Sequence, residues 1–424
     1  MNKTQFDAIL DVLHTVLPFT APADVCLSRY FRDHPKLGAR DRTEIAETVF
    51  GLLRHLPRLK WVCGEKAGVI DWMVAYWAAV EKRNLKELTE IFDTRRMEQA
   101  KEYKAVRWED APLAVRAGLP EWIAEAMLAD GFDEAGTLEI GRTMMQSAPL
   151  DLRANTLKMK REPIQAELTA QGIESVPTPY SPWGLRVTGK PGLSKLTLFK
   201  EGAFEVQDEG SQLLALLTGA KRGQMIADFC AGAGGKTLAI GAMMQSLGSL
   251  YAFDISEKRL SNLKPRLARS GLSNVRPQLL TSENDTKVKR LAGKMDAVLV
   301  DAPCSGLGTL RRNPDLKYRQ SAQSVAELNI KQANILASAS RLVKVGGRLV
   351  YATCSFLPCE NRKIVDDFLA AHPEFVLLDV RELLAKERVE IALDGECLQM
   401  SPMQHGTDGF FAAVMQRAPN AAAE

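Results

Sequence analysis

The sequence predicts an α/β protein in which a Rossmann-like domain follows an all-helical domain and a small α/β module. Three observations support this fold class. From residue 206 onward, apolar runs typical of buried strands alternate with amphipathic stretches typical of helices. One of these strands leads into a glycine-rich turn, residues 228–237, which reads DFCAGAGGKT. Residues 1–145, by contrast, place their apolar residues at helical spacing and show no strand-like alternation of comparable length.

The size and composition are those of a globular protein with more than one domain. The 424 residues are too many for one core, and the net charge of +3 permits nucleic-acid binding without requiring it. Seven scattered cysteines with no CxxC pair and no zinc spacing are typical of reduced thiols, so we expect no metal. No signal peptide and no bilayer-spanning apolar run is visible, so we expect a cytoplasmic protein without membrane association.

The N-terminal region, residues 1–145, is predicted to form five to eight short helices. Apolar residues recur at helical spacing in two runs: Phe6, Ile9, Leu10, Leu13 and Leu17, then Ile45, Val49, Leu52 and Leu53. The sequence leaves open whether the basic residues of this region contact RNA or form a solvated polar face. These residues are Arg40, Arg42, Arg54, Arg58 and Lys60.

A small α/β module is predicted over residues 146–205. Residues 150–155 indicate a strand, and residues 163–171 an amphipathic helix closed by Gly172. Short apolar pieces at 185–187 and 196–199 predict further strands. A modest basic character suggests a surface for a nucleic-acid backbone, and it comes from Lys158, Lys160, Arg161, Arg186 and Lys200.

The third region, residues 206–417, predicts a parallel sheet with helices on both faces, because its strands are mostly apolar throughout. The expected strands are 224–227, 249–253, 275–280, 297–300 and 348–352. Ligands bind at the carboxyl ends of the strands in such sheets. Polar residues at or just after those ends should therefore converge on one edge, and they are Asp228, Asp254, Asp301 and Cys354. Residues 418–424 are expected to be a disordered tail.

The glycine-rich turn predicts a cofactor site. Gly232, Gly234 and Gly235 allow a sharp bend and a close approach of the backbone to a ligand. Asp254, at the end of the next strand, can accept hydrogen bonds from ribose hydroxyls. The turn fails the last position of the dinucleotide pattern and lacks the spacing of a P-loop, which favours S-adenosylmethionine over NAD or a nucleotide. For any single aspartate, a helix N-cap is the alternative interpretation.

Two cysteines are candidates for covalent catalysis, because Cys304 and Cys354 each follow a predicted strand on the ligand edge. Addition of a thiolate to C6 of cytosine would make C5 nucleophilic enough to attack an electrophilic methyl group. The other cysteines, including Cys230 within the turn, are more typical of packing. Residues 310–319 interleave four cations with a tyrosine, which suits phosphate contacts and base stacking or, equally, a solvated charged loop.

Together these segments resemble the RsmB/Sun family of RNA cytosine-C5 methyltransferases, which includes bacterial ribosomal RNA enzymes. The resemblance covers about residues 150–417 and rests on Asp228–Thr237, Asp301–Gly306 with Arg311–Lys317, Thr353–Ser355 with Glu360–Asn361, and Gly406–Phe411. It implies an S-adenosylmethionine-dependent methyltransferase domain and a ferredoxin-like RNA-binding module. Residues 39–42 and 49–54 are similar to the NusB-like RNA-binding domain of the bacterial enzymes.

The resemblance also implies residue roles. Cys354 would attack C6, Cys304 would assist breakdown of the covalent adduct, and Asp301 would hold the cytosine edge near Lys236. The residues expected to hold the cofactor are Cys230, Ala231, Gly232, Ala233, Gly234, Gly235, Lys236, Asp254, Asp301 and a third acid, for which Asp285 is preferred to Glu283. The family commonly carries Ala-Pro where this chain has Gly232-Ala233, which predicts a more flexible turn.

The implied function is formation of 5-methylcytosine in RNA, most readily ribosomal RNA, by a monomeric enzyme. The alternatives are a transfer RNA or DNA cytosine-C5 methyltransferase and a non-catalytic RNA-binding ribosome assembly factor. In DNA enzymes the nucleophile follows a proline, as Cys304 does, but Thr353–Ser355 argues against that class. The presence of both cysteines and the cofactor aspartates argues against an assembly factor.

Overall fold

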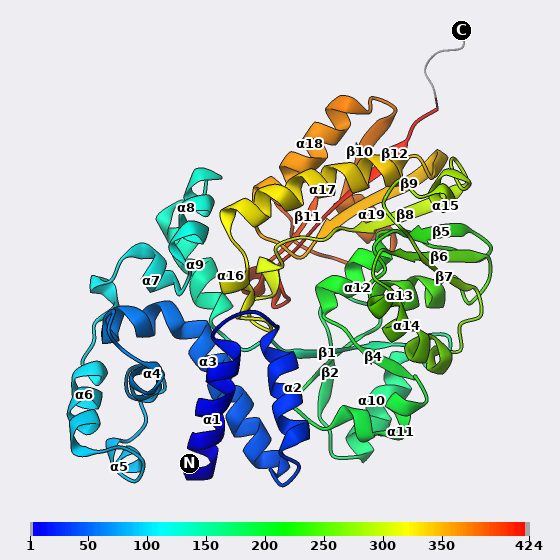
Figure 1. The fold of residues 1–424 in the computed structure, drawn as a ribbon. Coiled ribbons are helices and arrows are strands. Elements are labelled where there is room, and N and C mark those ends of the chain that lie inside the picture. The colour runs from blue at the N-terminus through cyan, green and yellow to red at the C-terminus, as the bar shows by residue number, and fades with distance from the viewer. Residues whose placement is uncertain (1–2, 420–424) are drawn as a thin grey trace. The chain divides into compact units, whose positions relative to one another are not determined.

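The structure is a computed structural model that describes residues 3–419, and these form two compact units. The helical unit comprises residues up to Ser147 together with Gly306–Val325. The sheet unit comprises Ala148–Ser305 together with the residues from Ala326 onward. The expected tail falls largely on residues 420–424, which lie outside the described residues. Figure 1 shows the elements of both units along the chain.

The helical unit confirms the helical N-terminal region that the sequence predicts. Its longest helix, α3, runs unbroken for 25 residues, so the helices are not all short. The elements are α1 (Lys3–Val16), α2 (Ala23–Asp33), α3 (Ala39–Cys63), α4 (Val69–Ala75), the π-helical turn η1 (Tyr76–Val80), α5 (Leu85–Leu88), α6 (Thr94–Lys104), η2 (Trp108–Asp110), α7 (Leu113–Ala117), α8 (Glu121–Ala129) and α9 (Glu134–Met144).

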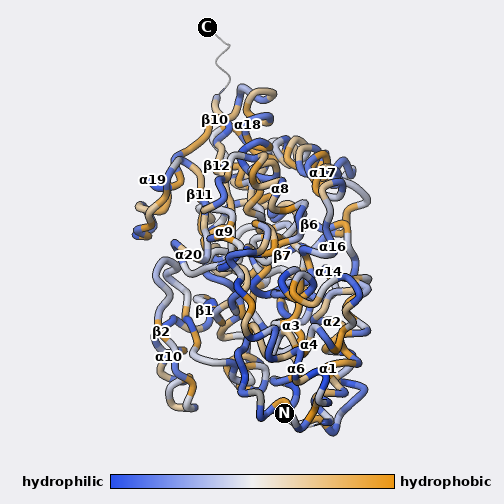
Figure 2. Tube along the Cα trace, turned by 90° about the vertical axis from the view of Figure 1, so that its left-hand side faces the viewer, coloured by the Kyte–Doolittle hydropathy of each residue, from blue (hydrophilic) through white to orange (hydrophobic). Residues whose placement is uncertain are grey.

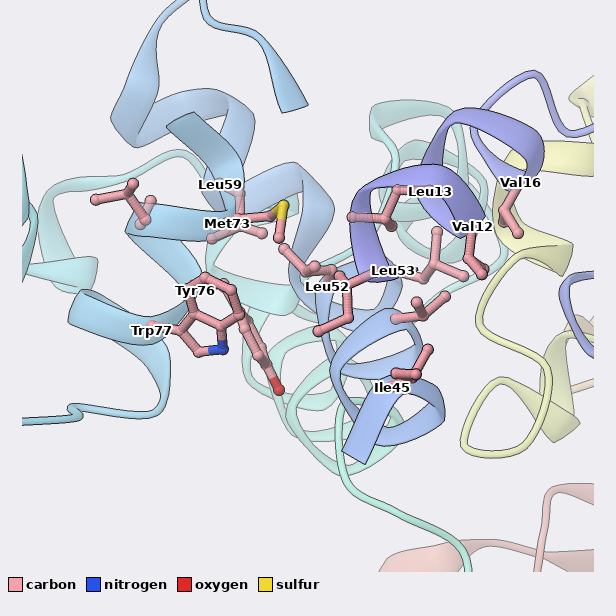
Figure 3. Close-up of a cluster of buried hydrophobic side chains, with 14 of the residues drawn as sticks. Val12, Leu13, Val16, Ile45, Leu52, Leu53, Leu59, Met73, Tyr76 and Trp77 are labelled. Atoms are coloured by element: carbon pink, nitrogen blue, oxygen red, sulfur yellow. The ribbon is translucent and has the colours of Figure 1, made fainter. Parts of the chain in front are cut away.

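The core of the helical unit forms where α1, α3, α4 and η1 bury their apolar sides against one another. Leu52, Leu53 and Leu59 lie on the buried side of α3, and Trp77 of η1 is fully buried beside them. Figure 3 shows side chains of this cluster. Because each fully buried aliphatic side chain contributes about 1.5–3 kcal/mol, the amphipathic spacing read from the sequence is what holds these helices together.

The segment 306–325 belongs to the helical unit although it follows a strand of the sheet unit in sequence. It contains η4 (Leu307–Thr309), α16 (Leu316–Arg319) and the start of α17 (Ala322–Ser340). Lys317 is only 3% exposed, and its Nζ donates to the carbonyls of Arg54 and Gly118 at 2.7 Å each. This one side chain therefore joins the segment to α3 and to the end of α7.

Tyr318 and Asp315 extend the same attachment. The Tyr318 hydroxyl donates to the Leu53 carbonyl at 3.0 Å, and its ring stacks on Phe19 with centroids 4.7 Å apart. Asp315 accepts a hydrogen bond from the backbone of Ala23 at 3.3 Å. The segment is thus held by groups along its length rather than by one contact.

Several cations considered above as RNA contacts are instead used inside the helical unit. Arg54 is buried and donates to the Arg311 carbonyl at 2.8 Å, while Arg311 donates to the Ser147 carbonyl at 3.1 Å. Arg58 donates to the carbonyls of Val115 and Arg116. Neither the RNA-contact interpretation nor the solvated-face interpretation fits Arg54, Arg311 or Lys317, because their side-chain nitrogens donate to backbone carbonyls.

The sheet unit begins with a small antiparallel sheet in the order β2-β3-β1-β4. Its elements are β1 (Leu150–Ala154), α10 (Arg161–Ala170), β2 (Ser175–Pro177), β3 (Gly184–Val187), η3 (Leu193–Lys195), α11 (Thr197–Lys200) and β4 (Phe204–Val206). Residues 196–199, expected as a strand, mostly form helix α11. A four-residue apolar run has no resolvable period, and here the Leu196 carbonyl accepts from Lys200 in the helical pattern.

The large sheet has the strand order β10-β12-β9-β8-β5-β6-β7, with β11 beside β12. The parallel strands that the sequence predicts are found, namely β5 (Met225–Asp228), β6 (Ser249–Asp254), β7 (Val275–Leu279), β8 (Met295–Asp301) and β9 (Val343–Thr353). Three antiparallel strands that were not expected complete it, namely β10 (Phe375–Leu378), β11 (Leu398–Met400) and β12 (Phe410–Arg417).

Helices cover both faces of the large sheet, as predicted. Successive side chains of a strand point to opposite faces, so Ile226 packs in one core with α12 and α13, whereas Ala227 packs in the other with α17 and α18. Colour changes along α17 in Figure 2 reflect its mixed hydropathy. The remaining helices are α12 (Glu209–Leu216), α13 (Gly235–Met243), α14 (Glu257–Ser270), α15 (Thr286–Lys289), η5 (Pro358–Glu360), α18 (Arg362–Ala371), α19 (Val380–Lys386) and α20 (Pro402–His405).

None of the helices found within residues 3–419 combines the length and the apolar character needed to cross a membrane.

Replacement of the buried lysine tests the attachment of segment 306–325. Lys317→Met should lower the free energy of unfolding of the helical unit by about 2–4 kcal/mol, because two buried carbonyls lose their donor. Amide hydrogen exchange in α3, monitored across a urea titration, measures this change. Arg319→Met, at a more exposed position of the same short helix, loses an ion pair with Asp315 at 3.5 Å; it is the control and should cost less than about 1 kcal/mol. Equal losses of unfolding free energy in the two variants would contradict the role of Lys317 in attaching this segment.

Candidate cofactor and catalytic site

A cavity of about 680 Å³ lies at the carboxyl ends of β5, β6, β8 and β9. This volume is within the range of small-molecule sites, about 300–1,000 Å³. Most of the residues that the sequence nominates for the site line this cavity, namely Cys230, Ala231, Gly232, Ala233, Gly235, Lys236, Asp254, Asp301, Cys304 and Cys354. The glycine turn and the two cysteines therefore lie around one cavity, as their positions at the ends of predicted strands indicated.

The glycine turn between β5 and α13 depends on two left-handed residues. Gly232 has φ +56° and Gly234 has φ +84°, a region that side chains disfavour. A Cβ on Gly234 would lie 2.1 Å from Cδ1 of Leu263 in α14, so only glycine lets this helix pack beneath the turn. Gly234 accordingly supports the turn from behind and is not among the lining residues.

The two aspartates at the ends of β5 and β6 differ in exposure to the cavity. Asp254 lines it, accepting hydrogen bonds from the backbone of Gly232 at 2.8 Å and of Ser256 at 2.7 Å. Asp228 is buried beneath the turn and accepts from the Thr237 hydroxyl at 2.7 Å. Burial raises the pKa of Asp228 to about 7, against which the Thr237 hydrogen bond acts. Asp228 therefore supports the site without lining it.

The two candidates for the third acid lie in different places. Asp285, the preferred residue, accepts hydrogen bonds from the backbone of Thr281 and Lys287 at 2.9 Å each and caps α15. The hydrogen bonds from Lys287 and then Thr281 lower the pKa of Asp285 to about 2. Asp285 is not among the lining residues, whereas Glu283 is.

The two cysteines face each other across the ends of β8 and β9. Their sulfurs are 3.4 Å apart, and the backbone N–H of Cys354 donates to the Cys304 sulfur at 3.4 Å. The hydrogen bond with Cys354, followed by burial and the Cys354 charge, raises the pKa of the Cys304 thiol well above its usual value. Cys304 is therefore held as a neutral thiol while Cys354 stays beside it.

Two consecutive residues hold the loops that carry these cysteines. Glu360 is fully buried and accepts hydrogen bonds from the backbone of Ser305 at 2.8 Å and from Gln332 at 3.0 Å. Asn361 accepts from the Thr353 hydroxyl and donates to the Ser355 carbonyl at 2.9 Å. Each loop is thus fixed next to its cysteine. The sequence marked Glu360 and Asn361 as part of a motif but gave them no role.

Lys236 and Asp301 form an ion pair in the cavity wall, with Nζ 2.7 Å from Oδ2. Burial alone would lower the pKa of Lys236, but the charge and hydrogen bond of Asp301, aided by Cys354, leave that pKa raised. Lys236 is therefore a cation beside the thiols. Sequence reasoning missed further lining residues because they carry no motif, namely Gln207, Ser211, Arg259, Arg266 and Lys331.

The lining fits S-adenosylmethionine by its chemistry. Ile255, Leu280 and Ile335 provide apolar surface for a ring, and Asp254 provides a carboxylate for hydroxyl groups. The carboxylates of Glu283 and Asp301 suit the positive charges of the donor. Within the described residues, no group of three or more His, Cys, Asp or Glu is placed to bind a metal ion.

Comparison with known protein families gives two matches. A family model described as 16S rRNA methyltransferase RsmB/F matches residues 215–416. A second, described as the RsmF/B-like ferredoxin-like domain, matches residues 119–193, which begins earlier than the module predicted at 146–205.

Curated relatives and solved structures agree with these matches. The chain is 30% identical to a probable ribosomal RNA small subunit methyltransferase B from Synechocystis sp., covering 93% of this chain and 95% of the relative. It is 31% identical to the corresponding Bacillus subtilis protein, covering 72% of this chain and 68% of the relative. The solved structure of PH0851 has a TM-score of 0.79 and 25% identity, and the match covers 98% of this chain and 99% of PH0851. NSun6 from Pyrococcus horikoshii, solved with SFG, has a TM-score of 0.62 and 21% identity over 71% and 99%, which supports the fold.

The buried aspartate under the turn gives a pH-dependent prediction. A folded-state pKa near 7, raised from about 3.9 in the unfolded chain, means that the contribution of Asp228 to stability is greatest in acid and is lost between about pH 4 and 7. Asp228→Asn removes this titration and keeps an acceptor for Thr237. As the pH rises from about 4 to 7, the free energy of unfolding of Asp228→Asn should increase relative to that of the wild type by at most about 1.4 kcal/mol per pH unit. Parallel stability profiles from pH 4 to 8 would show that Asp228 is not perturbed.

Proposed function

Because this chain belongs to the RsmB/F family of 16S rRNA methyltransferases, we propose that it methylates C5 of a cytosine in small-subunit ribosomal RNA. The methyl donor is S-adenosylmethionine. The observation that carries the proposal is the pair of thiols, 3.4 Å apart, in the wall of the cavity that contains the glycine turn. Covalent activation of a pyrimidine needs a thiol beside a methyl-donor site, and a second thiol 3.4 Å away supplies a further proton-transfer group.

The residues that would hold the cofactor are the backbone of the glycine turn, Asp254 and Glu283. When bound, S-adenosylmethionine supplies an electrophilic methyl group. We assign the third acidic contact to Glu283, because Asp285 is engaged in capping α15. The cytosine would then lie toward Asp301, Cys304 and Cys354.

In the proposed mechanism Cys354 is the nucleophile. Its thiolate forms a bond to C6, and the electron pair of the C5–C6 double bond becomes available at C5 for the methyl group. Asp301 holds the cytosine edge, and the Lys236 ammonium fixes Asp301 at 2.7 Å while adding positive charge beside the ring. The adduct then loses the C5 proton, the sulfur–C6 bond breaks, and Cys354 is released.

The second cysteine, Cys304, assists that breakdown. Its pKa is raised mainly by its hydrogen bond with Cys354, then by burial and by the Cys354 charge. When the Cys354 sulfur becomes a thioether on C6, it no longer carries a charge. The pKa of Cys304 should then fall, so that Cys304 can lose its proton to solvent and its thiolate can accept the C5 proton.

Cysteine variants test the two roles. Cys304→Ala should accumulate a covalent protein–RNA adduct, because C6 attack and methylation proceed but breakdown slows. Cys354→Ala should form none, since it lacks the nucleophile. A denaturing gel with labelled RNA, with mass spectrometry of the adduct, measures this, and Cys397→Ala serves as the control away from the cavity. Trapping by Cys354→Ala alone would reverse the assigned roles, and trapping by neither would remove the covalent mechanism.

Bisulfite sequencing of total RNA, from cells with and without the gene, tests the substrate. We expect a 5-methylcytosine of small-subunit ribosomal RNA to be lost with the gene and restored by the wild-type chain but not by Cys354→Ala. Loss of a site in transfer RNA would reassign the substrate. Methylation of matched DNA but not RNA by the purified protein would indicate a DNA enzyme, and no lost site anywhere would favour an assembly factor.

A further inference from the structure

We propose that Arg266 positions the glycine turn for the methyl donor, and that through Arg266 the small antiparallel sheet becomes part of the cofactor site. Arg266 lies on α14 and touches both the turn and Glu205 of β4. The proposal deepens the proposed function, because it rests on the turn being the cofactor site. It assigns a role to a residue that no sequence motif marked.

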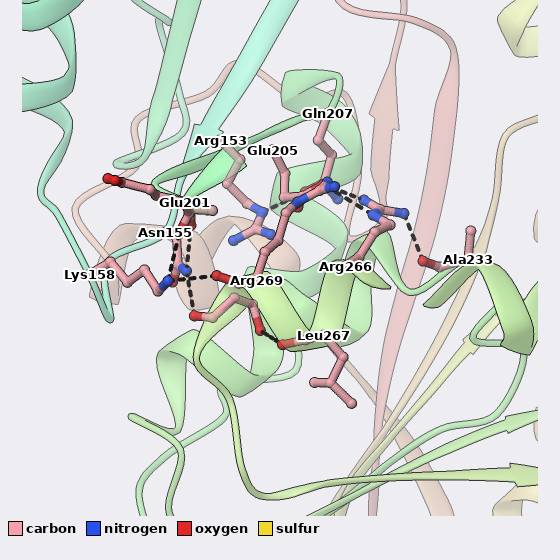
Figure 4. Close-up of polar contacts among 12 residues, drawn as sticks. Arg153, Asn155, Lys158, Glu201, Glu205, Gln207, Ala233, Arg266, Leu267 and Arg269 are labelled. Atoms are coloured by element: carbon pink, nitrogen blue, oxygen red, sulfur yellow. Dashed lines mark hydrogen bonds and ion pairs between the residues drawn. The ribbon is translucent and has the colours of Figure 1, made fainter. Parts of the chain in front are cut away.

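The contacts of Arg266 use every nitrogen of its guanidinium. Nη1 donates to the Ala233 carbonyl at 2.7 Å, while Nε and Nη2 donate to Oε2 of Glu205 at 3.1 and 2.9 Å. Figure 4 shows this side chain reaching from Glu205 on one side to Ala233 on the other. Charge-assisted hydrogen bonds of this kind are stronger than neutral ones, and the planar guanidinium fixes their direction.

Glu205 is itself held firmly, by its strand in the small sheet and by Arg269 of α14. Its other oxygen accepts two hydrogen bonds from Arg269, at 3.1 and 2.7 Å, and Arg269 lies over the Phe199 ring at 4.4 Å. The carboxylate is 5% exposed and pairs in register with Arg153 on β1. The anchor for Arg266 is therefore a buried, doubly paired carboxylate on a strand, which has little freedom to move.

The small sheet also contributes directly to the cavity wall. Gln207, which follows β4, lines the cavity and accepts a hydrogen bond from the buried Arg153 at 2.6 Å. The amide of Gln207 donates to Ser211, another lining residue, at 3.1 Å. The cofactor cavity is thus lined by residues of the large sheet and by residues that follow the small sheet.

The turn needs such a contact because its own sequence leaves it free. Gly232 and Gly234 flank Ala233, and this stretch contains no proline to restrict the backbone. From α14, Leu263 packs against Gly234, and Arg266, one helical turn later, fixes the carbonyl of Ala233. Fixing the turn before the ligand arrives lowers the entropic cost of binding, which should appear as affinity.

The experiment compares two arginines that share the same carboxylate. In isothermal titration of the full chain with S-adenosylhomocysteine and no RNA, Arg266→Ala should raise Kd about tenfold, the effect of one charge-assisted hydrogen bond. Arg269→Ala breaks the other half of the Glu205 pairing without touching the turn and should change Kd less than twofold. Arg266→Lys, which keeps the charge but loses the planar guanidinium with its several donors, should give an intermediate Kd.

Steady-state kinetics gives an independent readout. KM for S-adenosylmethionine should rise in Arg266→Ala while kcat at saturating donor stays within about twofold, a split that general destabilisation does not produce. Equal Kd values for wild type and Arg266→Ala, or equal losses for Arg266→Ala and Arg269→Ala, overturn the proposal. If Arg266→Ala does not fold, Arg266→Lys decides between these outcomes. A wild-type chain that binds no S-adenosylhomocysteine would instead contradict the proposed function.

Discussion

The parallel pairing of β8 with β9 sets the distance between the two cysteines on which the candidate chemistry depends. Asp301 lies opposite Ala352 in this register, so the chain reaches Cys304 and Cys354 a few residues later on neighbouring loops. A shift in register would separate the sulfurs, which are 3.4 Å apart. The buried carboxylate of Glu360 and the amide of Asn361 hold these loops, so that the geometry of the pair does not depend on a ligand.

The cofactor side of the cavity is held by a different kind of contact. Backbone freedom at Gly232 and Gly234 allows the turn to approach a ligand, but the same freedom must be restricted for binding to be strong. Leu263 restricts it by packing and Arg266 by charge. Both belong to α14, whose sequence shows only an amphipathic charged helix. A flexible turn and a rigid helix thus form one functional element.

The sequence predicted those parts of the structure that depend on local pattern. Apolar runs identified the parallel strands, and the carboxyl-end rule brought Asp254, Asp301, Cys304 and Cys354 to one cavity. It preferred Asp285 to Glu283 for the third acidic contact, and it gave no sign that Asp285 caps α15. It also could not foresee that Lys317 is buried, since a lysine in a stretch rich in cations gives no sign of two carbonyls far away in sequence. Contacts of this kind depend on the assembled fold.

The membership of residues 306–325 in the helical unit has a consequence for biosynthesis. The N-terminal helices emerge first from the ribosome, yet the donors of Lys317 and Tyr318 that pair with carbonyls of α3 are made much later. Until then these carbonyls and the Phe19 ring lack their final partners. Vectorial folding, in which an N-terminal domain closes before the next is translated, is therefore incomplete for this chain. The helical unit reaches its final state only after the first four strands of the large sheet have been synthesised.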